Sequence, residues 1–253
     1  MKPLAIDLFC GLGGWTDGLL AEGYDVIGFD IEQHVYGEQR YPAQLVVQDV
    51  LTLHGSQFRT ADLIVASPPC QRYSYMAMPW TRAKAQAAAI RADETGQSLA
   101  DLNALFNACF RIQREACEAA GRHIPMVVEN VRGAQPWVGR AAWNYGSFYL
   151  WGDVPALMPP RVTDGLKVPS FRFDGSGKSF QTASVKSHGL HHSDDSGTKI
   201  GGDWFSDPQS TCRRHGSKSK ARKAASAMIA KIPLPLSRHV ARVFRPEPFR
   251  EAA

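Results

Sequence analysis

Two residues stand where a reactive side chain could act, Cys70 and Glu129. Cys70 follows the apolar run 63–65 and the pair Pro68-Pro69. Two prolines can neither extend a strand nor enter a regular helix interior, so they force a turn just beyond the carboxyl end of the expected strand. Ligands of open α/β sheets bind at that edge, which places Cys70 as a nucleophile. The alternative is a small buried cysteine that only packs.

Glu129 follows a second apolar run, 126–128, and is therefore expected at the same edge. A carboxyl after three apolar residues is partly desolvated, and desolvation raises its pKa. Such a group holds a proton near neutral pH and can act as a general acid. Taken alone, Glu129 could equally be a helix cap or a surface acid.

The first expected strand, 4–9, runs into a glycine-rich turn, 10–14, and then a helix over 15–21 that Gly23 ends. This order lets the backbone approach a ligand closely and aims a helix N-terminus at it. Glycine turns are common, so the motif by itself is weak evidence.

The next two expected strands, 25–29 and 44–47, end in Asp30 and Asp49. Asp30 lies 19 residues after Gly11, the separation at which an acid binds ribose hydroxyls in nucleotide-binding folds. Polar or glycine features at three consecutive strand ends predict an adenosine-type cofactor at this edge.

The remaining pattern predicts a long functional or mobile segment and several further elements. The segment is 71–97, in which 83–92 is a candidate helix. Apolar residues at three- and four-residue steps from Leu99 to Ala116 predict a helix with Ser98 as N-cap, on which Cys109 and Cys117 are packing residues. Further elements are a strand over 146–151, a helix over 224–232, an interruption at 233–235, and a last helix over 236–244.

Length and composition indicate a soluble globular protein of one main domain. No apolar run reaches the roughly 18 residues of a membrane span, and the start does not read as a signal peptide. Five cysteines without paired metal-ligand spacing fit free thiols in a reducing cytoplasm.

The positive charge is concentrated near the C-terminus. Between Pro208 and Pro246 the sequence has ten Lys or Arg and no acid, which leaves 19 basic and 24 acidic residues elsewhere. This distribution suggests a polyanion partner, with a merely solvated face as the equal alternative.

Core periodicity is poor from about 159 to 219, where Gly, Ser, Asp, His and Lys dominate and aromatic residues are interspersed. We interpret this stretch as a small recognition region, in which basic side chains position a phosphate backbone and other side chains read bases. Its histidines and cysteine match no standard zinc spacing, so no metal site is predicted; they are His188, His191, His192, Cys212 and His215.

Three motifs in series resemble the DNA cytosine-C5 methyltransferase family: Asp7-Leu8-Phe9-Cys10-Gly11-Leu12-Gly13-Gly14, Pro68-Pro69-Cys70-Gln71 and Glu129-Asn130-Val131. The resemblance covers roughly residues 4 to 152, and 228–236 is similar, less closely, to the closing cofactor motif of the family. It implies an α/β fold, a Rossmann-like S-adenosylmethionine-dependent methyltransferase sheet with helices on both faces, plus a small irregular target-recognition region. The catalytic and cofactor-binding domain is then 1–158 with 224–253, and the recognition region is 159–223.

The resemblance implies S-adenosylmethionine as cofactor and double-stranded DNA as partner. The methionine part of the cofactor would be lined by Phe9, Gly11, Gly13 and Gly14. Its ribose would be bound by Asp30, and its adenine would be contacted by Ile31 on one face and by Asp49 and Val50. The site would be completed by Pro68 and Lys231. The predicted catalytic loop residues are Cys70, Glu129, Asn130, Pro69, Gln71 and Ser74. The predicted nucleic-acid contacts are Arg72, Arg132, Arg140, Arg213, Arg214, Lys218 and Lys220.

The implied chemistry explains the residue types. Carbon 5 of cytosine is a poor nucleophile, and addition of the Cys70 thiolate to carbon 6 would activate it. Glu129 would protonate or hydrogen-bond ring nitrogen 3, while Asn130 would hold the loop. The reaction requires a flipped-out cytosine.

The sequence departs from the family in two places. The family usually carries a glutamine and two arginines after the Glu-Asn-Val strand, whereas 144–150 has no arginine; Arg132 or Arg140 could substitute. The Gly-Asn pair of the closing motif is Ala230-Lys231. The Lys231 ammonium would lie unfavourably close to the cationic sulfonium of S-adenosylmethionine. One hypothesis is therefore that the enzyme prefers a donor bearing a carboxylate. The alternative is that the alignment slips by one residue and Lys231 contacts phosphate or solvent.

The expected protein is a monomeric, cytoplasmic, phage-type or bacterial DNA (cytosine-5-)-methyltransferase without a membrane segment, of the kind found in restriction-modification. Two alternatives stay open. One is an RNA (tRNA) methyltransferase with the same chemistry. The other is a non-catalytic nucleic-acid-binding module, which the missing arginines favour and the intact Cys70 and Glu129 oppose.

Overall fold

The computed structural model describes residues 2–73, 80–158, 223–224, 227 and 230–246. The chain divides into two compact units. Among described residues, the larger unit holds 2–33, 41–73, 80–158 and 232–246, and the smaller holds 34–40 with the described residues of 223–231. The fold of the larger unit follows.

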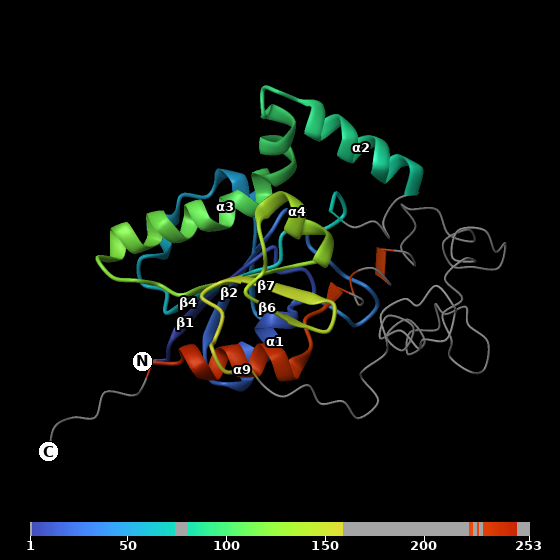
Figure 1. The fold of residues 1–253 in the computed structure, drawn as a ribbon. Coiled ribbons are helices and arrows are strands. Elements are labelled where there is room, and N and C mark those ends of the chain that lie inside the picture. The colour runs from blue at the N-terminus through green and yellow to red at the C-terminus, as the bar shows by residue number, and fades with distance from the viewer. Residues whose placement is uncertain (1, 74–79, 159–222, 225–226, 228–229, 247–253) are drawn as a thin grey trace, which may run out of the picture. The chain divides into compact units, whose positions relative to one another are not determined.

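A seven-stranded sheet with the strand order β3-β2-β1-β4-β5-β7-β6 forms the centre of this unit (Figure 1). Its strands are β1 Leu4–Leu8, β2 Asp25–Asp30, β3 Gln44–Val47, β4 Leu63–Ala66, β5 Met126–Asn130, β6 Trp143–Tyr145 and β7 Phe148–Gly152. The strands β1 to β5 run parallel, whereas β7 pairs antiparallel with both β5 and β6. The five parallel strands therefore end at one common edge.

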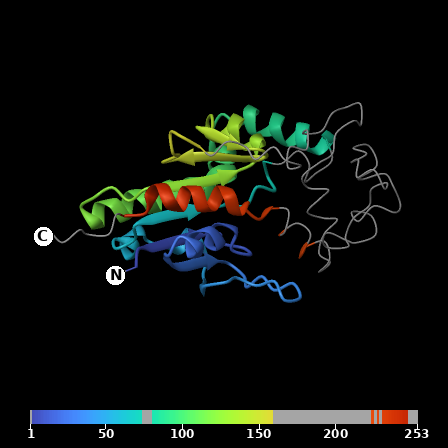
Figure 2. The same cartoon turned by 90° about the horizontal axis from the view of Figure 1, so that it is seen from below.

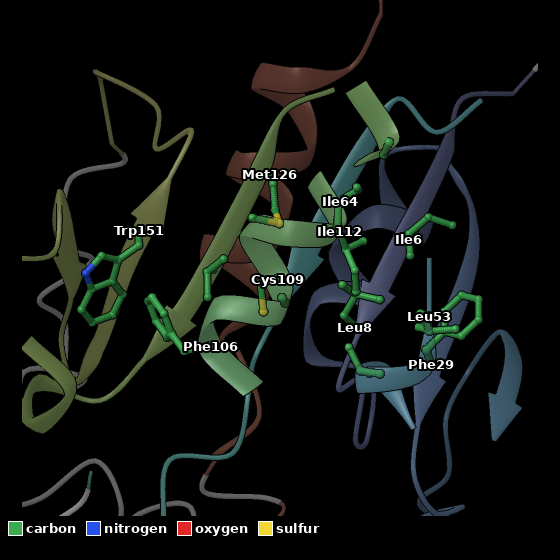
Figure 3. Close-up of a cluster of buried hydrophobic side chains, with 14 of the residues drawn as sticks. Ile6, Leu8, Phe29, Leu53, Ile64, Phe106, Cys109, Ile112, Met126 and Trp151 are labelled. Atoms are coloured by element: carbon green, nitrogen blue, oxygen red, sulfur yellow. The ribbon is translucent and has the colours of Figure 1, made fainter. Parts of the chain in front are cut away.

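Alternate residues of the central strands bury into two different layers, because successive side chains of a strand point to opposite faces. Figure 3 shows one layer, in which side chains of β1, β4 and β5 pack with α3 (Gln97–Ala120). This core includes Ile6, Leu8, Ile64, Ala66, Met126 and Val128 from the strands and Phe106, Cys109 and Ile112 from α3. The intervening residues Ala5, Leu63, Val65 and Val127 are equally buried but belong to the other face.

That other face is covered by α1 (Gly14–Ala21) and α9 (Leu234–Phe244), which pack against each other. Figures 1 and 2 show the two helices side by side, on the face of the sheet opposite α3. The Glu22 carboxylate, just after α1, pairs with Arg238 at 2.7 Å and Arg242 at 2.9 Å. Two arginines of the basic C-terminal stretch, Arg238 and Arg242, thus connect α9 to the end of α1. The predicted layout of a sheet with helices on both faces is confirmed.

Short elements complete the unit: α2 Trp80–Ala92, α4 Gln135–Val138, and the 3-10 turns η1 Val50–Thr52, η2 Gly55–Phe58 and η3 Arg132–Ala134. None of the helices within the described residues is both long enough and apolar enough to cross a membrane.

Three sequence-based expectations need correction. Ser98 is not the N-cap of α3: the helix starts after Gly96, whose φ is 72°, and Asp93 Oδ2 accepts from the Ser98 N–H at 2.7 Å. The candidate helix over 83–92 is α2, which begins three residues earlier than expected, at Trp80. The last helix begins at Leu234 rather than Leu236, because a proline in the first helical turn removes only an N–H that has no partner within the helix.

The strand expected over 146–151 is β7, which begins at Phe148 and forms a hairpin with β6. Gly146 has a φ of 61° and makes the turn between them. Of the helix expected over 224–232, the described residues 224, 227 and 230 are helical, 231 and 232 are not, and the others lie outside the described residues.

Candidate active site

The parallel strands bring the predicted catalytic and cofactor residues to one edge of the sheet. Ala66 of β4 pairs with Val128 of β5, so the residues that follow them, Ser67 and Glu129, lie next to each other. Leu8 of β1 pairs with Ala66 on one side and with Phe29 of β2 on the other. The glycine turn, the Cys70 loop and Glu129 therefore lie at consecutive strand ends.

The loop that carries Cys70 is tied to helix α3. The Tyr73 N–H donates to the Cys70 carbonyl at 3.0 Å, which closes a tight turn. The Tyr73 hydroxyl, which is buried, donates toward the Leu102 carbonyl at 3.2 Å and Asn103 Oδ1 at 2.9 Å. Cys70 itself is half-buried, between the buried Tyr73 and the exposed Pro69. The sequence analysis did not single out Tyr73 as the residue that holds this loop.

Glu129 lies within β5 and its residue is 9% exposed. Burial raises the pKa of its carboxyl to about 8, and a hydrogen bond from Ser67 opposes that rise. The group is therefore largely protonated at neutral pH. The neutral carboxylic acid predicted from the three preceding apolar residues is what the burial produces.

Asn130 joins the two loops of the site. Its Nδ2 donates to the Pro68 carbonyl at 2.9 Å, and its Oδ1 accepts from the Val131 N–H at 2.8 Å. The side chain is 1% exposed, so both bonds are shielded from water. The Asn130 side-chain amide thus connects the turn before Cys70 to Val131, the first residue after β5. These contacts fit the predicted role of Asn130 in holding the loop.

The Glu129 carboxyl influences the Cys70 thiol. Burial raises the pKa of the Cys70 thiol to about 11, and the charge of ionised Glu129 contributes to that rise. A protonated Glu129 carries no charge and does not disfavour the thiolate. While Glu129 holds its proton, only burial raises the thiol pKa, so the thiolate forms more readily than beside a charged Glu129.

The glycine turn is joined to Asp30. The Gly11 N–H donates to Asp30 Oδ2 at 2.9 Å, across the 19 residues that the spacing singled out. Gly11 has a φ of 51° and Gly13 one of 74°, which L side chains rarely adopt. A Cβ at Gly13 would also lie 2.5 Å from the Pro42 side chain, so this turn requires glycine.

The turn fits an adenosine-type cofactor. A Cβ built at Gly11 meets nothing within 4 Å, so open space faces the backbone there. Ile31, the predicted adenine contact, is 70% exposed although it is apolar, as a side chain available to an aromatic ring would be. Phe9 adopts a φ of 56°, the one non-glycine positive φ among the described residues, and strained backbone of this kind clusters at functional sites.

The two residues predicted at the adenine differ in exposure. Asp49 is half-buried and its Oδ1 accepts from the Leu51 N–H at 2.9 Å, which caps η1. Val50 is 2% exposed and packs in the core with Phe29 and Leu53.

A buried polar cluster beneath the glycine turn was missed by the sequence analysis. Asp7 is 1% exposed, its Oδ2 accepts from Thr16 Oγ1 at 2.6 Å, and that hydroxyl meets the Tyr41 hydroxyl at 2.6 Å. Burial raises the pKa of Asp7 well above its ordinary range, and Asp7 Oδ1 has no hydrogen-bond partner among the described residues. An acid inside the apolar run of the first strand was the available signal.

The predicted nucleic-acid contacts are only partly placed. Arg72 Nη1 donates to the Asp101 carbonyl at 2.8 Å, and Arg132 and Arg140 are exposed on either side of α4. Gln71 is also exposed. The remaining predicted residues, Ser74, Arg213, Arg214, Lys218 and Lys220, lie outside the described residues. Lys231 belongs to the smaller unit, so its role toward a donor stays a prediction.

The part of the chain that the structure describes contains no cluster of three His, Cys, Asp or Glu that could hold a metal ion. The histidines and cysteine weighed as zinc ligands lie outside it.

The fold and the site together define a Rossmann-like sheet with a cysteine and a neutral carboxylic acid beside a cofactor-type glycine turn. The family model of the C-5 cytosine-specific DNA methylase matches residues 4–85. This segment includes the glycine turn, Asp30 and the Cys70 loop, so the match confirms the predicted resemblance for the first two of the three motifs, and Glu129-Asn130-Val131 lies beyond it. The methyl donor of that family is S-adenosylmethionine, as the resemblance implied. No curated protein matches the chain.

Similar solved structures include a proposed DNA modification methyltransferase encoded within a prophage in E. coli, with 20% identity and a TM-score of 0.36 over 67% of this chain and 49% of that one. The S. pombe Dnmt2 methyltransferase has 15% identity and a TM-score of 0.33 over 55% of this chain and 37% of that one. The Entamoeba histolytica methyltransferase EhMeth has 16% identity and a TM-score of 0.32, over 55% and 41%. The chain thus spans half or less of the length of these structures.

Proposed function

We propose that this chain transfers a methyl group to carbon 5 of a cytosine in double-stranded DNA through a covalent adduct with Cys70. The observation that carries the proposal is the pairing of a half-buried thiol with a buried, neutral carboxylic acid at one sheet edge. Both lie beside a glycine turn that fits the donor. S-adenosylmethionine would supply a methyl group on a cationic sulfur.

The donor would be held by the glycine turn and the ends of β1 and β2. Backbone at Gly11 and Gly13 can approach the methionine part because no Cβ intervenes. Asp30 has one carboxylate oxygen on Gly11 and lies at the position that binds ribose hydroxyls. Ile31 offers an exposed apolar surface to the adenine.

The proposed reaction begins when the Cys70 thiol gives its proton to solvent water and its sulfur adds to carbon 6 of cytosine. As the Sγ–C6 bond forms, Glu129 gives its proton to ring nitrogen 3, which prevents a full negative charge on the ring. The resulting enamine carbon 5 would take the methyl group from the donor, whose methyl–sulfur bond breaks and whose cationic sulfur leaves as a neutral thioether. A base then removes the carbon 5 proton, the Sγ–C6 bond breaks, and nitrogen 3 returns its proton to Glu129.

The substrate must leave the duplex stack before Cys70 can reach it. Neither face of a paired, stacked cytosine admits a side chain, so the proposal includes base flipping. The exposed Arg72, Arg132 and Arg140 and the basic C-terminal stretch are the candidates for phosphate contacts.

DNA is preferred to RNA because the matched family acts on DNA. The tRNA alternative shares the site chemistry, and so does the carboxylated donor suggested by Lys231. The bacterial or phage setting, a restriction partner and a monomeric state stay predictions. So does the division into 1–158 with 224–253 and 159–223.

The test is methyl transfer from labelled S-adenosylmethionine to mixed-sequence duplex DNA and, separately, to tRNA. We expect label on DNA that is lost in Cys70→Ser and strongly reduced in Glu129→Gln. Label on tRNA alone would move the activity to RNA. Salt-sensitive binding without transfer would support the binding module instead.

A control replaces Cys117, a second half-buried thiol, which bonds to the Ile124 backbone away from the sheet edge. Cys117→Ser should retain methyl transfer. For Lys231→Asn, unchanged donor affinity and selectivity would refute the altered-donor hypothesis.

A further inference from the structure

Asn103 of helix α3 lies between the Cys70 loop and α4, and it is bonded to both. The residue is 6% exposed. Its side-chain oxygen lies 2.9 Å from the Tyr73 hydroxyl, and its Nδ2 donates to the Trp137 carbonyl at 2.8 Å. Tyr73 closes the turn that begins at Cys70, whereas Trp137 belongs to the chain that continues from Glu129. The proposed reaction gives this buried amide no part.

The partners of Asn103 fix the orientation of its amide. A backbone carbonyl can only accept, so the group that faces Trp137 is the NH2 donor. The amide oxygen therefore faces Tyr73, and because this oxygen can only accept, the Tyr73 hydroxyl is the donor. Burial raises the pKa of Tyr73 to about 12, so the hydroxyl keeps its proton across the pH range of an assay. The order of donation is thus from Tyr73 to Asn103 to Trp137.

The bond to Trp137 meets a need of helix α4. The carbonyls of the last helical turn have no donor within their own helix, and α4 spans only the four residues Gln135–Val138. Asn103 supplies a donor for one of these carbonyls. The centre of the Trp137 ring lies 5.1 Å from the guanidinium carbon of Arg91 in α2. Trp137 therefore connects α4 with both α3 and α2.

The side of the loop that precedes Cys70 is held by other residues. The Trp15 indole Nε1 donates to Ser67 Oγ at 3.0 Å, and Asn130 Nδ2 donates to the Pro68 carbonyl at 2.9 Å. These bonds connect the start of the loop to α1 and to β5. Neither of them acts on the residues after the thiol.

The side of the loop that follows Cys70 is held by α3. Besides Asn103, the Tyr73 hydroxyl has the Leu102 carbonyl as a longer contact at 3.2 Å, and the exposed Arg72 donates to another carbonyl of α3. These two contacts end on α3. The Asn103 amide, by contrast, continues to α4, and its burial shields both of its bonds from water, which strengthens them.

We propose that Tyr73 and Asn103 are positioning residues that hold the Cys70 thiol at a fixed place beside Glu129. The inference rests on the proposed function, in which the sulfur adds to carbon 6 while the carboxyl protonates nitrogen 3 of the same ring. The separation of those two ring atoms is fixed, so the thiol and the acid must be held at a matching separation. A loop fixed only on the Ser67 side could swing about that point, and a displacement of about 1 Å can cost about a hundredfold in rate.

The experiment compares Tyr73→Phe, Asn103→Leu and the double variant with the wild-type full chain. Asn103→Leu retains a branched side chain but removes both bonds of the amide. The matched control is Tyr24→Phe, because the Tyr24 hydroxyl is also buried and donates to a backbone carbonyl, that of Ala241, at 3.0 Å. Tyr24 precedes β2 and so lies at the opposite edge of the sheet from Cys70.

The first readout is the rate of iodoacetamide labelling at Cys70 at pH 8, without DNA or donor. Burial is the main cause that raises the pKa of this thiol to about 11, so a loop released into water should have a lower thiol pKa and react roughly threefold to tenfold faster. We expect this increase in Tyr73→Phe and a smaller one in Asn103→Leu, where the Leu102 contact remains. Cys109, fully buried in α3, reports unfolding and should stay unlabelled.

The second readout is kcat and KM of methyl transfer to duplex DNA. We expect kcat to fall about tenfold in Tyr73→Phe while KM stays within about twofold, because the change concerns the placement of a reacting group rather than substrate binding. The thiol then reacts faster with a small reagent but more slowly with cytosine. The effects of the single variants should not add in the double variant, since both interrupt the same connection. Tyr24→Phe should match wild type in both readouts.

Three results would overturn the inference: Cys70 labelling that Tyr73→Phe leaves unchanged, faster labelling that Cys109 or the Tyr24→Phe control shares, or faster labelling with an unchanged kcat. The labelling needs neither donor nor DNA. Labelling that changes as expected in a protein whose wild type transfers no methyl group would refute the proposed function alone.

Discussion

The interaction between Cys70 and Glu129 predicts how the thiol should react with an alkylating agent when Glu129 is replaced. The pKa of the thiol is raised from 9.0 to about 11, first by burial and second by the Glu129 charge. At pH 7 Glu129 is neutral and burial alone still holds the thiol pKa above 9.0, so less than about one hundredth of Cys70 is thiolate and its alkylation should be slow.

The effect of Glu129→Gln should depend on pH in a defined direction. Below about pH 8 the carboxyl is neutral, and a neutral amide changes the charge near Cys70 little. Above about pH 8 the Glu129 carboxylate of the wild type is charged and disfavours the Cys70 thiolate. The amide that Glu129→Gln introduces carries no charge and has no such effect. Because the Glu129 charge is the second cause of the raised thiol pKa, after burial, the variant should react roughly threefold to tenfold faster there.

The assay is the rate of iodoacetamide labelling at Cys70, followed by peptide mass spectrometry between pH 6 and about pH 10. Cys70→Ser identifies the labelled peptide, and labelling at Cys117 provides an internal control that should not change. The rate profiles of wild type and Glu129→Gln are compared. If they remain equal above pH 8, or differ by one constant factor at every pH, the electrostatic coupling between Glu129 and Cys70 is refuted.

Three further predictions concern the structure that supports the site. Burial of an acid whose pKa rises from 4.5 to about 8 means that the free energy of unfolding should fall as pH rises through that interval and then level off; urea unfolding of wild type should show this slope, and an equal slope in Glu129→Gln would contradict it. Asn130→Ala should lose about 1–3 kcal/mol of stability, because it leaves the buried Pro68 carbonyl unpaired, and a loss below about 0.5 kcal/mol by thermal or urea unfolding would argue against that bond. Gly13→Ala should weaken S-adenosylmethionine binding measured by calorimetry, because its Cβ meets Pro42 at 2.5 Å with φ at 74°, whereas Gly37→Ala, where nothing lies within 4 Å, is a control with equally positive φ that should retain affinity.

The strands could be read from the sequence because each is a short apolar run that ends in a distinctive residue. The runs at 25–29, 44–47 and 63–65 match β2, β3 and β4 within one residue. The candidate helix 83–92 matches the end of α2 but starts three residues too late, since the hydrophobic residues of this helix are mostly alanine and give little helical periodicity. The start of α3 was misassigned because Asp93, not Ser98, accepts the hydrogen bond there.

The sequence by itself determined which chemistry was available: a cysteine and an acid at strand ends, glycines where backbone must approach a ligand, and an acid 19 residues after Gly11. Such inferences are local, since strand ends and tight turns depend on neighbouring residues. Only the tertiary structure decided the states of those groups. The pKa of Glu129 depends on its burial, and the pKa of Cys70 depends on burial and on the Glu129 charge; both conditions arise when β4 and β5 pair. The bonds from Trp15 to Ser67 and from Asn130 to Pro68 join positions 52 and 62 residues apart, a separation that no local pattern encodes.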